Sequence, residues 1–415
     1  MKKTKLALAI ATAAFASSAM ATNGTNMTGV CAQSSAMGGT GVAAYYGAEN
    51  VIVNPAMIGK STGTEFSFGG TLFKPDVSND GTNPAGGMNS SSADTFVIPS
   101  VSLTSRISDT LTFGIGMYGT SGMGVDYRTA TAPGLMQAQS NLQIMRFVPT
   151  LAYNEDNFGI GFSPIIQYGA LDINYNMGGF GAGFGNPAIP SGGFQNIGSG
   201  MSSDLGFGYS IGGYFDASED LTVAASYTSA IDMKYDAQLS TASGPFVAAG
   251  ALPAAFADNL DQPAELKAGV AYKMGNYTLT GDFKQIRWSD ADGYGDFGWE
   301  DQNVISIGAK YQGNDFWLGA GYNKADNPIK EQAMTAPGGL ATNMFNNLFF
   351  PATTEQHFSI GGGYNLTKNV AIDAAIVIAP EVKTTVNAPI LPASMGPNTT
   401  KHSQNAYTVS VRYNF

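Results

Sequence analysis

Few side chains in this sequence are suited to catalysis. The chain contains two histidines, His357 and His402, and one cysteine, Cys31. His357 and Ser359 would share one face of a β-strand, as a general base and a nucleophile could, but no acidic residue that would orient the histidine is evident. A barrel hydrolase is therefore a remote alternative. A lone cysteine cannot form a disulfide within the chain, and we interpret Cys31 as a small buried side chain rather than a reactive thiol.

The segment from Asp290 to Asp301 is a second chemical candidate. It reads DADGYGDFGWED and resembles part of an EF-hand calcium loop, but Tyr294 occupies a ligand position of that motif. We interpret the segment as a solvated acidic loop. The sequence thus predicts no metal site, no cofactor and no catalytic residue.

Five cations stand at polar positions of predicted strands: Arg146, Lys267, Lys284, Lys310 and Arg412. Beside an apolar cleft, such a cation could hold a carboxylate through a charge-assisted hydrogen bond. A cation of this kind more often pairs with an acidic side chain on a neighbouring strand. The five are candidate carboxylate anchors, and the sequence does not choose among them.

Composition narrows the class of protein. Only 12% of the residues are Asp, Glu, Lys or Arg, which is about half the soluble average, whereas the chain holds 53 glycines, 24 phenylalanines and 19 tyrosines. The net charge of −11 argues against a nucleic-acid partner. Few charges with many glycines and aromatic residues indicate an outer-membrane β-barrel.

The first 21 residues have the pattern of a secretory signal peptide. A basic start at Lys2 precedes a short apolar run from Leu6 to Phe15, and Ala19 and Ala21 fit the small residues before a cleavage point. No uninterrupted apolar run long enough for a helical span follows this leader. Any passage through a membrane must therefore use strands.

Alternation of side-chain character predicts those strands. In the last segment, 407–415, YTVSVRYNF, aromatic residues and valine alternate with threonine, serine, arginine and asparagine. In a barrel in lipid the apolar face looks outward and the polar face inward. A soluble β-sandwich or propeller is the opposing interpretation. Fourteen strands are predicted near 64–73, 95–106, 110–119, 142–154, 157–172, 204–216, 220–232, 263–274, 276–287, 302–312, 315–323, 355–366, 369–379 and 404–415.

The connections between these strands alternate strictly between short turns and long loops. Short turns are expected on the periplasmic side and long loops outside, so both ends of the mature chain should be periplasmic. The long loops are predicted at 74–94, 120–141, 173–203, 233–262, 288–301, 324–354 and 380–403.

A compact segment of small residues precedes the first strand. It reads GGTGVAAYYGAENVIVNPAMIGK over residues 38–60, and Pro55 should prevent helix continuation and favour an extended Asn54. We interpret residues 22–60 as a plug, or hatch, inside a barrel formed by residues 61–415. A disordered periplasmic tail is the alternative. The hatch residues singled out are Gly38, Gly39, Gly41, Asn54, Pro55 and Ala56.

This stretch resembles the N-terminal signature of the long-chain fatty-acid and aromatic-hydrocarbon outer-membrane transporters, the FadL/TodX type. There, a Gly-rich motif is followed by Asn-Pro-Ala. Weaker matches continue at Trp288-Ser289, at Gly321-Tyr322 and at Gly362-Gly363-Tyr364. Met57-Ile58 after Asn-Pro-Ala and Cys31 within the segment depart from the family pattern. The resemblance implies a monomeric fourteen-stranded barrel, an N-terminal hatch and passive uptake of hydrophobic molecules.

The resemblance also implies a kinked third strand that releases ligand sideways into the membrane. Gly114, Gly116 and Gly119 in that strand fit such a kink, although glycines are common in the other strands too. Three long loops carry exposed apolar residues that suit ligand capture or packing of the loops on one another. The capture candidates are Phe180, Phe184, Phe194, Phe246, Phe256, Phe345, Phe349 and Phe350.

The function expected from the sequence is uptake of hydrophobic compounds, either long-chain fatty acids or hydrocarbons, through the bacterial outer membrane. No enzyme activity is expected, and a general or solute-selective porin and an adhesin are the alternatives. The expected partners are an apolar small molecule, outer-membrane lipid and lipopolysaccharide, and the barrel-assembly machinery through the terminal Phe415. The sequence leaves the identity of the ligand open.

Overall fold

The computed structural model describes residues 22–82, 87–177, 195–387 and 397–415. Within them one continuous sheet contains eighteen strands, four of which have two residues and fourteen of which build the wall of a barrel. The four short strands are β1 (Thr22–Asn23), β2 (Asn26–Met27), β4 (Asn89–Ser90) and β9 (Asn196–Ile197). The wall strands are β3 (Thr64–Asn79), β5 (Phe96–Arg106), β6 (Leu111–Asp126), β7 (Gln139–Glu155), β8 (Phe158–Asn176), β10 (Ser202–Asp216), β11 (Leu221–Thr228), β12 (Glu265–Met274), β13 (Tyr277–Ile286), β14 (Gln302–Gln312), β15 (Phe316–Ala325), β16 (Gln356–Asn365), β17 (Val370–Val386) and β18 (Asn398–Asn414).

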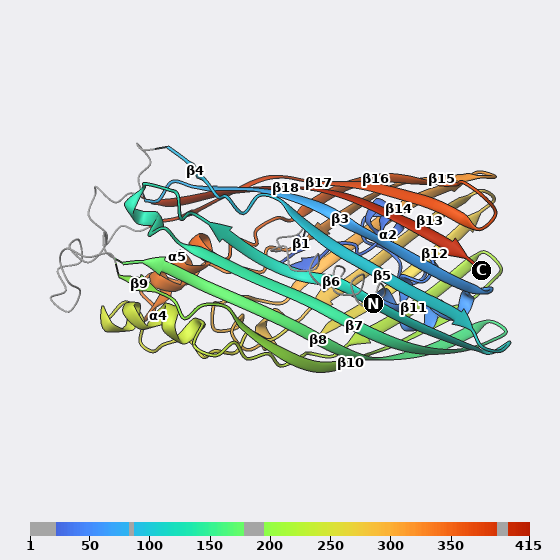
Figure 1. Ribbon diagram of the computed structural model, residues 1–415, viewed down its shortest axis with the longest axis horizontal. Coiled ribbons are helices and arrows are strands. Elements are labelled where there is room, and N and C mark those ends of the chain that lie inside the picture. Colours follow the sequence, from blue (N-terminus) through green and yellow to red (C-terminus); the bar gives the residue numbers. More distant parts are fainter. Residues whose placement is uncertain (1–21, 83–86, 178–194, 388–396) are drawn as a thin grey trace, which may run out of the picture.

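The wall strands are antiparallel to their neighbours, and the last pairs with the first. β18 runs beside β3 from Asn414 opposite Glu65 to Thr400 opposite Asn79, which closes the cylinder. Figure 1 shows the tilted strands with short turns at one end and the long connections at the other. The prediction of a fourteen-stranded antiparallel barrel is confirmed.

The alternation that predicted the strands separates the two faces of the wall. Along β17, Ile372, Ile376 and Ile378 are exposed on the outside, whereas Asp373 and Ala375 are buried on the inside. An outward apolar face and an inward polar face are the arrangement that a barrel in lipid requires. No helix in the described ranges is long and apolar enough to cross a membrane.

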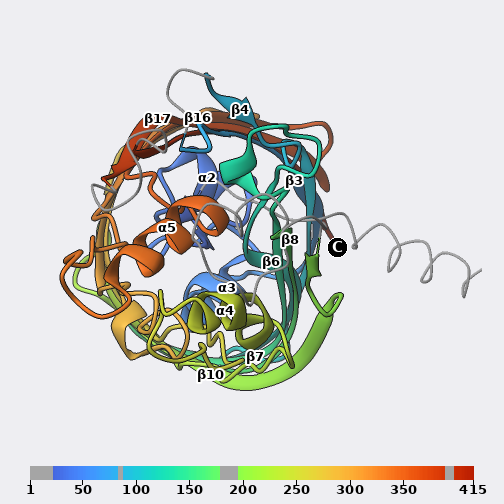
Figure 2. The same cartoon turned by 90° about the vertical axis from the view of Figure 1, so that its left-hand side faces the viewer.

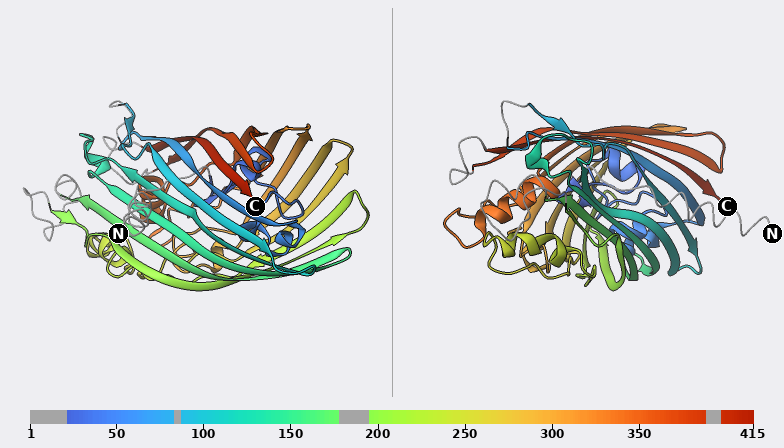
Figure 3. Two further views of the ribbon diagram at one scale, coloured as in Figure 1. Left: turned by 45° about the vertical axis from the view of Figure 1, so that its right-hand side comes forward. Right: turned by 60° about the vertical axis from the view of Figure 1, so that its left-hand side comes forward.

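Several strands extend beyond their predicted ends on the long-loop side. β3 continues to Asn79, β6 to Asp126 and β17 to Val386, so the loops predicted to start at 74, 120 and 380 were too long. The ladder of backbone hydrogen bonds continues here without the strict alternation of side chains. In Figure 3 these extensions lie toward the left-hand, long-loop end of the barrel.

Short helices lie inside the barrel and across its long-loop end. The α-helices are α2 (Ala32–Ala36), α3 (Asn50–Val53), α4 (Leu239–Ala248) and α5 (Gly339–Phe349), and the 3-10 helices are η1 (Pro55–Lys60), η3 (Pro133–Leu135) and η4 (Trp288–Asp290). α4 and α5 lie in the long loops predicted at 233–262 and 324–354. In Figure 2, α2 and α3 lie within the ring of strands, and α4 and α5 lie across its mouth.

Candidate functional site

The N-terminal segment, residues 22–60, contains a turn at residues 38–41 whose backbone conformation favours glycine. Gly38, Gly39 and Gly41 have φ angles of +71°, +84° and +149°. A Cβ atom on Gly39 would lie 2.1 Å from the carbonyl oxygen of Thr28, and one on Gly38 would lie 2.8 Å from the backbone of Tyr322 in β15. These glycines permit both the turn and its close approach to the wall.

A wall carboxylate holds this turn. Oδ2 of Asp282 in β13 accepts hydrogen bonds from the backbone N–H groups of Gly41 at 2.8 Å and Val42 at 3.0 Å. Two residues along the same strand, the Thr280 hydroxyl lies 2.8 Å from that of Thr40. The turn is therefore fixed to β13 by one charged and one neutral contact.

The Asn54-Pro55-Ala56 motif forms a second attachment. Asn54 is extended, as predicted, with φ −148° and ψ 109°, and its Oδ1 accepts the Ala56 N–H at 3.1 Å to cap η1. Its amide nitrogen donates to the carbonyl of Val42 at 2.8 Å. The wall approaches closely, because a Cβ atom on Gly212 of β10 would lie 2.0 Å from Asn54 Oδ1. The motif leads into η1 and not directly into the first wall strand.

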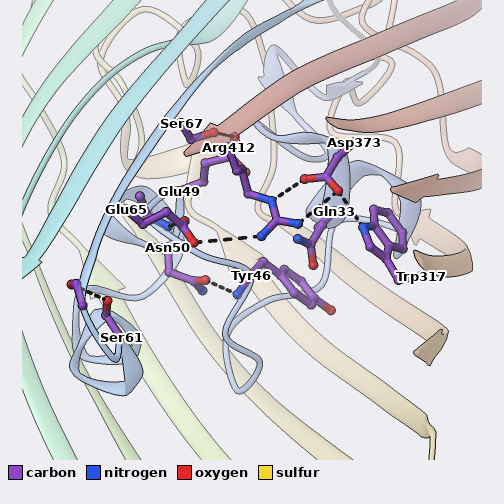
Figure 4. Close-up of polar contacts among 12 residues, drawn as sticks. Gln33, Tyr46, Glu49, Asn50, Ser61, Glu65, Ser67, Trp317, Asp373 and Arg412 are labelled. Atoms are coloured by element: carbon purple, nitrogen blue, oxygen red, sulfur yellow. Dashed lines mark hydrogen bonds and ion pairs between the residues drawn. The ribbon is translucent and has the colours of Figure 1, made fainter. Parts of the chain in front are cut away.

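Two buried glutamates form a third attachment, near the start of β3 (Figure 4). The Ala48 N–H donates to the Glu65 carboxylate at 2.5 Å, and the Ser67 hydroxyl donates to Glu49 at 2.9 Å. Glu49 belongs to the N-terminal segment, and Glu65 and Ser67 belong to the wall. Burial raises the pKa of Glu49 to about 7, because the charged form loses its hydration.

One arginine completes this acidic cluster. The Arg412 guanidinium of β18 pairs with Asp373 of β17 and lies 3.9 Å from the Glu65 carboxylate. Trp317 of β15 donates its indole N–H to Asp373 at 2.6 Å. Arg412 therefore interacts with carboxylates of the chain itself. This is the alternative to ligand binding that the sequence left open, pairing with an acidic side chain on a neighbouring strand.

Three of the other candidate anchors meet at one cavity inside the barrel. Arg146 of β7, Lys267 of β12 and Lys284 of β13 line a luminal cavity of about 80 Å³ together with Glu265, Asp282 and the N-terminal segment. Lys267 pairs with Glu265 at 3.1 Å, and Arg146 donates to the side-chain oxygen of Gln167 at 2.9 Å. Within the described residues, neither Arg146 nor Lys284 forms an ion pair with a carboxylate.

The fifth candidate, Lys310, lies apart from that group. It donates to the side-chain oxygen of Gln33 at 3.2 Å and lies 5.6 Å from the Trp317 ring centroid. With Arg412 it lines a separate cavity of about 230 Å³ near the short-turn end. The five cations thus divide between two cavities. In the luminal one, Arg146 and Lys284 form no close ion pair with a carboxylate of the described residues, whereas Lys267 pairs with Glu265.

An apolar cavity of about 300 Å³ lies at the long-loop end, between α4 and α5. Phe246, Phe345 and Phe349 line it. Phe345 also packs on Phe256 and on Phe350, with ring centroids 5.4 Å and 5.6 Å apart. The loops therefore pack on one another and leave an apolar cavity between them. Phe180, Phe184 and Phe194 lie outside the described residues.

The third wall strand, β6, contains the irregularity expected of a kink. Its pairing with β7 shifts between Gly119 and Ser121, which leaves Thr120 as an extra residue. Pairing of β6 with β5 ends at Tyr118 opposite Ser100, although β5 itself continues to Phe96. Within the described part of the chain, a stretch of β6 above Tyr118 thus has no partner on β5.

The three glycines singled out in β6 have different surroundings. Gly119 borders the irregularity. A Cβ atom on Gly114 would lie 2.6 Å from Val51, and one on Gly116 would lie 2.3 Å from the Tyr118 ring, in the regular part of the strand. These two glycines make room for the N-terminal segment and for Tyr118. The N-terminal segment also pairs with the irregular part, since Asn26 lies opposite Ser121 and the Gly122 N–H donates to the Thr25 carbonyl.

Comparison with known proteins places these features in a family. The model of the outer membrane protein transport protein family (OMPP1/FadL/TodX) matches residues 7–415. The chain belongs to this family. The Long-chain fatty acid transport protein of Escherichia coli is 22% identical over 362 residues, which cover 76% of this chain and 80% of the relative. This member of the OMPP1/FadL/TodX family is therefore an outer-membrane transport protein.

Solved structures show the same fold as this family member. The Pseudomonas putida toluene transporter TodX superposes with a TM-score of 0.67 at 20% identity, covering 94% of this chain and 99% of TodX. A Pseudomonas aeruginosa FadL homologue superposes with a TM-score of 0.69 at 14% identity, covering 94% of this chain and all of the homologue. At these identities the likeness concerns the fold.

The remaining chemical candidates of this OMPP1/FadL/TodX protein have structural partners. His357 Nδ1 lies 3.1 Å from Asn323 Oδ1, and the Ser359 hydroxyl donates to the Ala36 carbonyl at 2.9 Å. Within the described ranges, which include all of 290–301, no cluster of acidic, histidine or cysteine side chains has the arrangement of a metal site. Cys31 is buried in the N-terminal segment, at the start of α2, and accepts the Ser34 N–H at 3.4 Å.

The wall contacts of the N-terminal segment were not found from the sequence. Asp282, Glu65 and Glu265 occupy ordinary inward positions of alternating strands, where an acidic residue gives no local sign of its partner. The acidic residues themselves were one available signal for these contacts. Few charged residues occur on the inward faces, and a buried charged side chain requires a polar or charged partner.

Proposed function

We propose that this protein takes up long-chain fatty acids across the outer membrane by passive diffusion. Two cavities carry the proposal: the apolar one between α4 and α5, and the luminal one, where Arg146 and Lys284 form no close ion pair with a carboxylate of the described residues. A molecule with an apolar chain and one carboxylate has the chemistry that suits both. The names of the relatives, a fatty acid transport protein and a toluene transporter, support an apolar cargo.

The route leads from capture to lateral release. Ligand collects at the apolar cavity, passes into the luminal cavity and leaves sideways between β5 and β6. Thr120 supports this order, because it both lines the luminal cavity and is the extra residue of β6. Residues 22–60 act as the hatch, and release requires movement of the part that contacts β6 through Asn26.

The proposal extends to assembly of the protein in the membrane. Residues 1–21 act as a signal peptide, and the exposed Phe415 after β18 contacts the barrel-assembly machinery. The chain works as a monomer whose outer face contacts lipid and lipopolysaccharide. A general porin is disfavoured, because the N-terminal segment occupies the lumen that a porin leaves open.

Ligand binding by the purified full-length protein tests the proposal. Oleate and oleyl alcohol have the same apolar chain, and toluene represents a hydrocarbon cargo. Lys284→Met should weaken oleate binding about ten-fold or more and leave oleyl alcohol unchanged, because a hydrogen bond to a charged group is lost. Lys273→Met, an exposed lysine of β12, is the matched control. Binding of toluene without oleate would overturn the fatty-acid assignment.

A further inference from the structure

Asp282 borders the luminal cavity and holds the hatch at the same time. Its Oδ2 accepts hydrogen bonds from the Gly41 and Val42 N–H groups, whereas its Oδ1 has no hydrogen-bond partner in the described residues. Lys284 stands two residues further along β13, on the same inward face, and lines the same cavity. One buried carboxylate thus connects the ligand cavity with the hatch backbone.

Glu265 of β12 repeats this arrangement. Its Oε1 accepts a hydrogen bond from the Asn26 side-chain amide of the hatch at 3.1 Å, and its Oε2 pairs with Lys267 at 3.1 Å. Asp282 and Glu265 are the two carboxylates lining the cavity, and both are buried. Each of them therefore holds part of the hatch.

The charges around the luminal cavity determine how a bound anion would affect the contacts of Asp282 and Glu265 with the hatch. Arg146, Lys267 and Lys284 face Asp282 and Glu265, so three positive charges surround two negative ones. A ligand carboxylate would be attracted by the surplus positive charge. Once bound, it would share the lysines that balance the two hatch-holding carboxylates and would repel both of them at close range.

We propose that Asp282 is the positioning residue through which a bound carboxylate releases the hatch, with Glu265 as its second contact. This inference rests on the proposed fatty-acid cargo. It adds that the negative charge of the fatty-acid carboxylate releases the hatch and so opens the route to lateral release. Because coupling between two equilibria is reciprocal, the docked hatch also weakens carboxylate binding. An uncharged ligand of the same chain length fills the cavity without releasing the hatch.

The native cysteine provides a reporter of hatch release. Cys31 is the single cysteine of the chain and is 1% exposed within the hatch. Its alkylation by a small maleimide thus requires the hatch to leave its docked position. The full-length protein in a neutral detergent is measured with no ligand, with oleate and with oleyl alcohol. Oleate should accelerate alkylation about five-fold or more, and oleyl alcohol should not.

Asp282→Asn is the decisive variant, because asparagine keeps an oxygen for Gly41 and Val42 but removes the charge. The variant should remain docked, bind oleate more tightly and lose the oleate-induced acceleration. Thr280→Val is the matched control: it removes the neutral contact to Thr40 on the same strand and should keep the response to ligand charge.

A second variant approaches Asp282 from the neighbouring strand. A Cβ atom on Gly269 of β12 would lie 2.3 Å from Asp282 Oδ1 and 2.8 Å from the Val42 side chain of the hatch. Gly269→Ala should therefore displace the contact between Asp282 and the hatch turn, raise Cys31 alkylation without ligand and leave little further acceleration by oleate. This variant provides the test if Asp282→Asn does not fold.

The possible failures are distinguishable. If oleate binds but accelerates alkylation no more than oleyl alcohol, or if Asp282→Asn responds to oleate as the native protein does, the inference is overturned and the proposed cargo stands. An unchanged rate in Gly269→Ala would also overturn it. If displacement of a fluorescent fatty acid detects no oleate binding, the proposed cargo itself is wrong.

Discussion

The backbone N–H of Ala48 donates a 2.5 Å hydrogen bond to the carboxylate of Glu65. The contact joins the hatch to the first wall strand, 17 residues further along the chain. It is one of several polar contacts between hatch and wall around the lumen, with those of Asp282, Glu265 and Asn54. The hatch is therefore held by specific polar contacts, which single substitutions can remove.

Glu65→Ala should loosen the hatch. A hydrogen bond to a charged acceptor contributes about 1.5–3 kcal/mol, so its loss should raise the alkylation rate of Cys31 by about ten-fold or more. Glu155→Ala, at an exposed short-turn position, is the control and should leave the rate unchanged. Equal rates in the two variants would mean that Glu65 does not hold the hatch.

Docking of the hatch should weaken as the pH rises from about 5 to 8. Burial raises the pKa of Glu49 to about 7, from an ordinary value of 4.5, so the docked state binds the proton more tightly than the released state. The stabilisation is complete below the ordinary pKa and is lost as the pH approaches 7. Between pH 6 and pH 8 the change amounts to about ten-fold in the docking equilibrium.

The alkylation rate of the native protein relative to Glu49→Gln isolates this effect of pH. The intrinsic reactivity of the thiol cancels in that ratio, because both released states expose the same cysteine. The ratio should rise about ten-fold from pH 6 to pH 8. A ratio that stays flat would show that Glu49 does not titrate on release of the hatch.

A charge in the cavity at the long-loop end should impair capture. Met344 of α5 lines the apolar cavity and is partly exposed, so Met344→Asp places a carboxylate in it with little damage to packing. Uptake at low oleate concentration should fall several-fold, and uptake at saturation should change little. Met88→Asp, an exposed methionine outside the cavity, should behave as the native protein; a similar loss in both would contradict a capture role.

Deletion of Thr120 should close the lateral route. Gly119 pairs with Met145 and Ser121 with Ile144, so removal of the extra residue leaves a regular ladder in the same register. Oleate should still bind, but its uptake should fall at least ten-fold if release is lateral. Normal uptake by this variant would place the exit elsewhere.

The strands were predictable because each one alternates between lipid and lumen. Their ends were not, because β3 continues through Lys74 and Asp76, where the outward face is polar although the pairing with β18 persists. The helix α5 was missed because its asparagines and threonine favour helices weakly. Packing of Phe345 and Phe349 in the loop cluster supports that helix, and this packing is invisible in the local sequence.

The contacts of the N-terminal segment were predictable only in part. Three glycines and Asn54 were found because backbone geometry demands those residue types. Asp282 and Glu65 were missed, since each meets its hatch partner through the closure of the barrel and not through spacing along the chain. Among the five cations, only the fold separates Lys284, which forms no close ion pair within the described residues, from Arg412, which pairs with Asp373.

Oleate entry into liposomes with lipopolysaccharide in the outer leaflet tests the central claim most directly. The native protein should speed entry well above the rate of protein-free liposomes, without passing a steady ionic current, and deletion of Thr120 should return entry to the protein-free rate. Equal entry with and without the protein, or a steady open-channel current, would contradict the account.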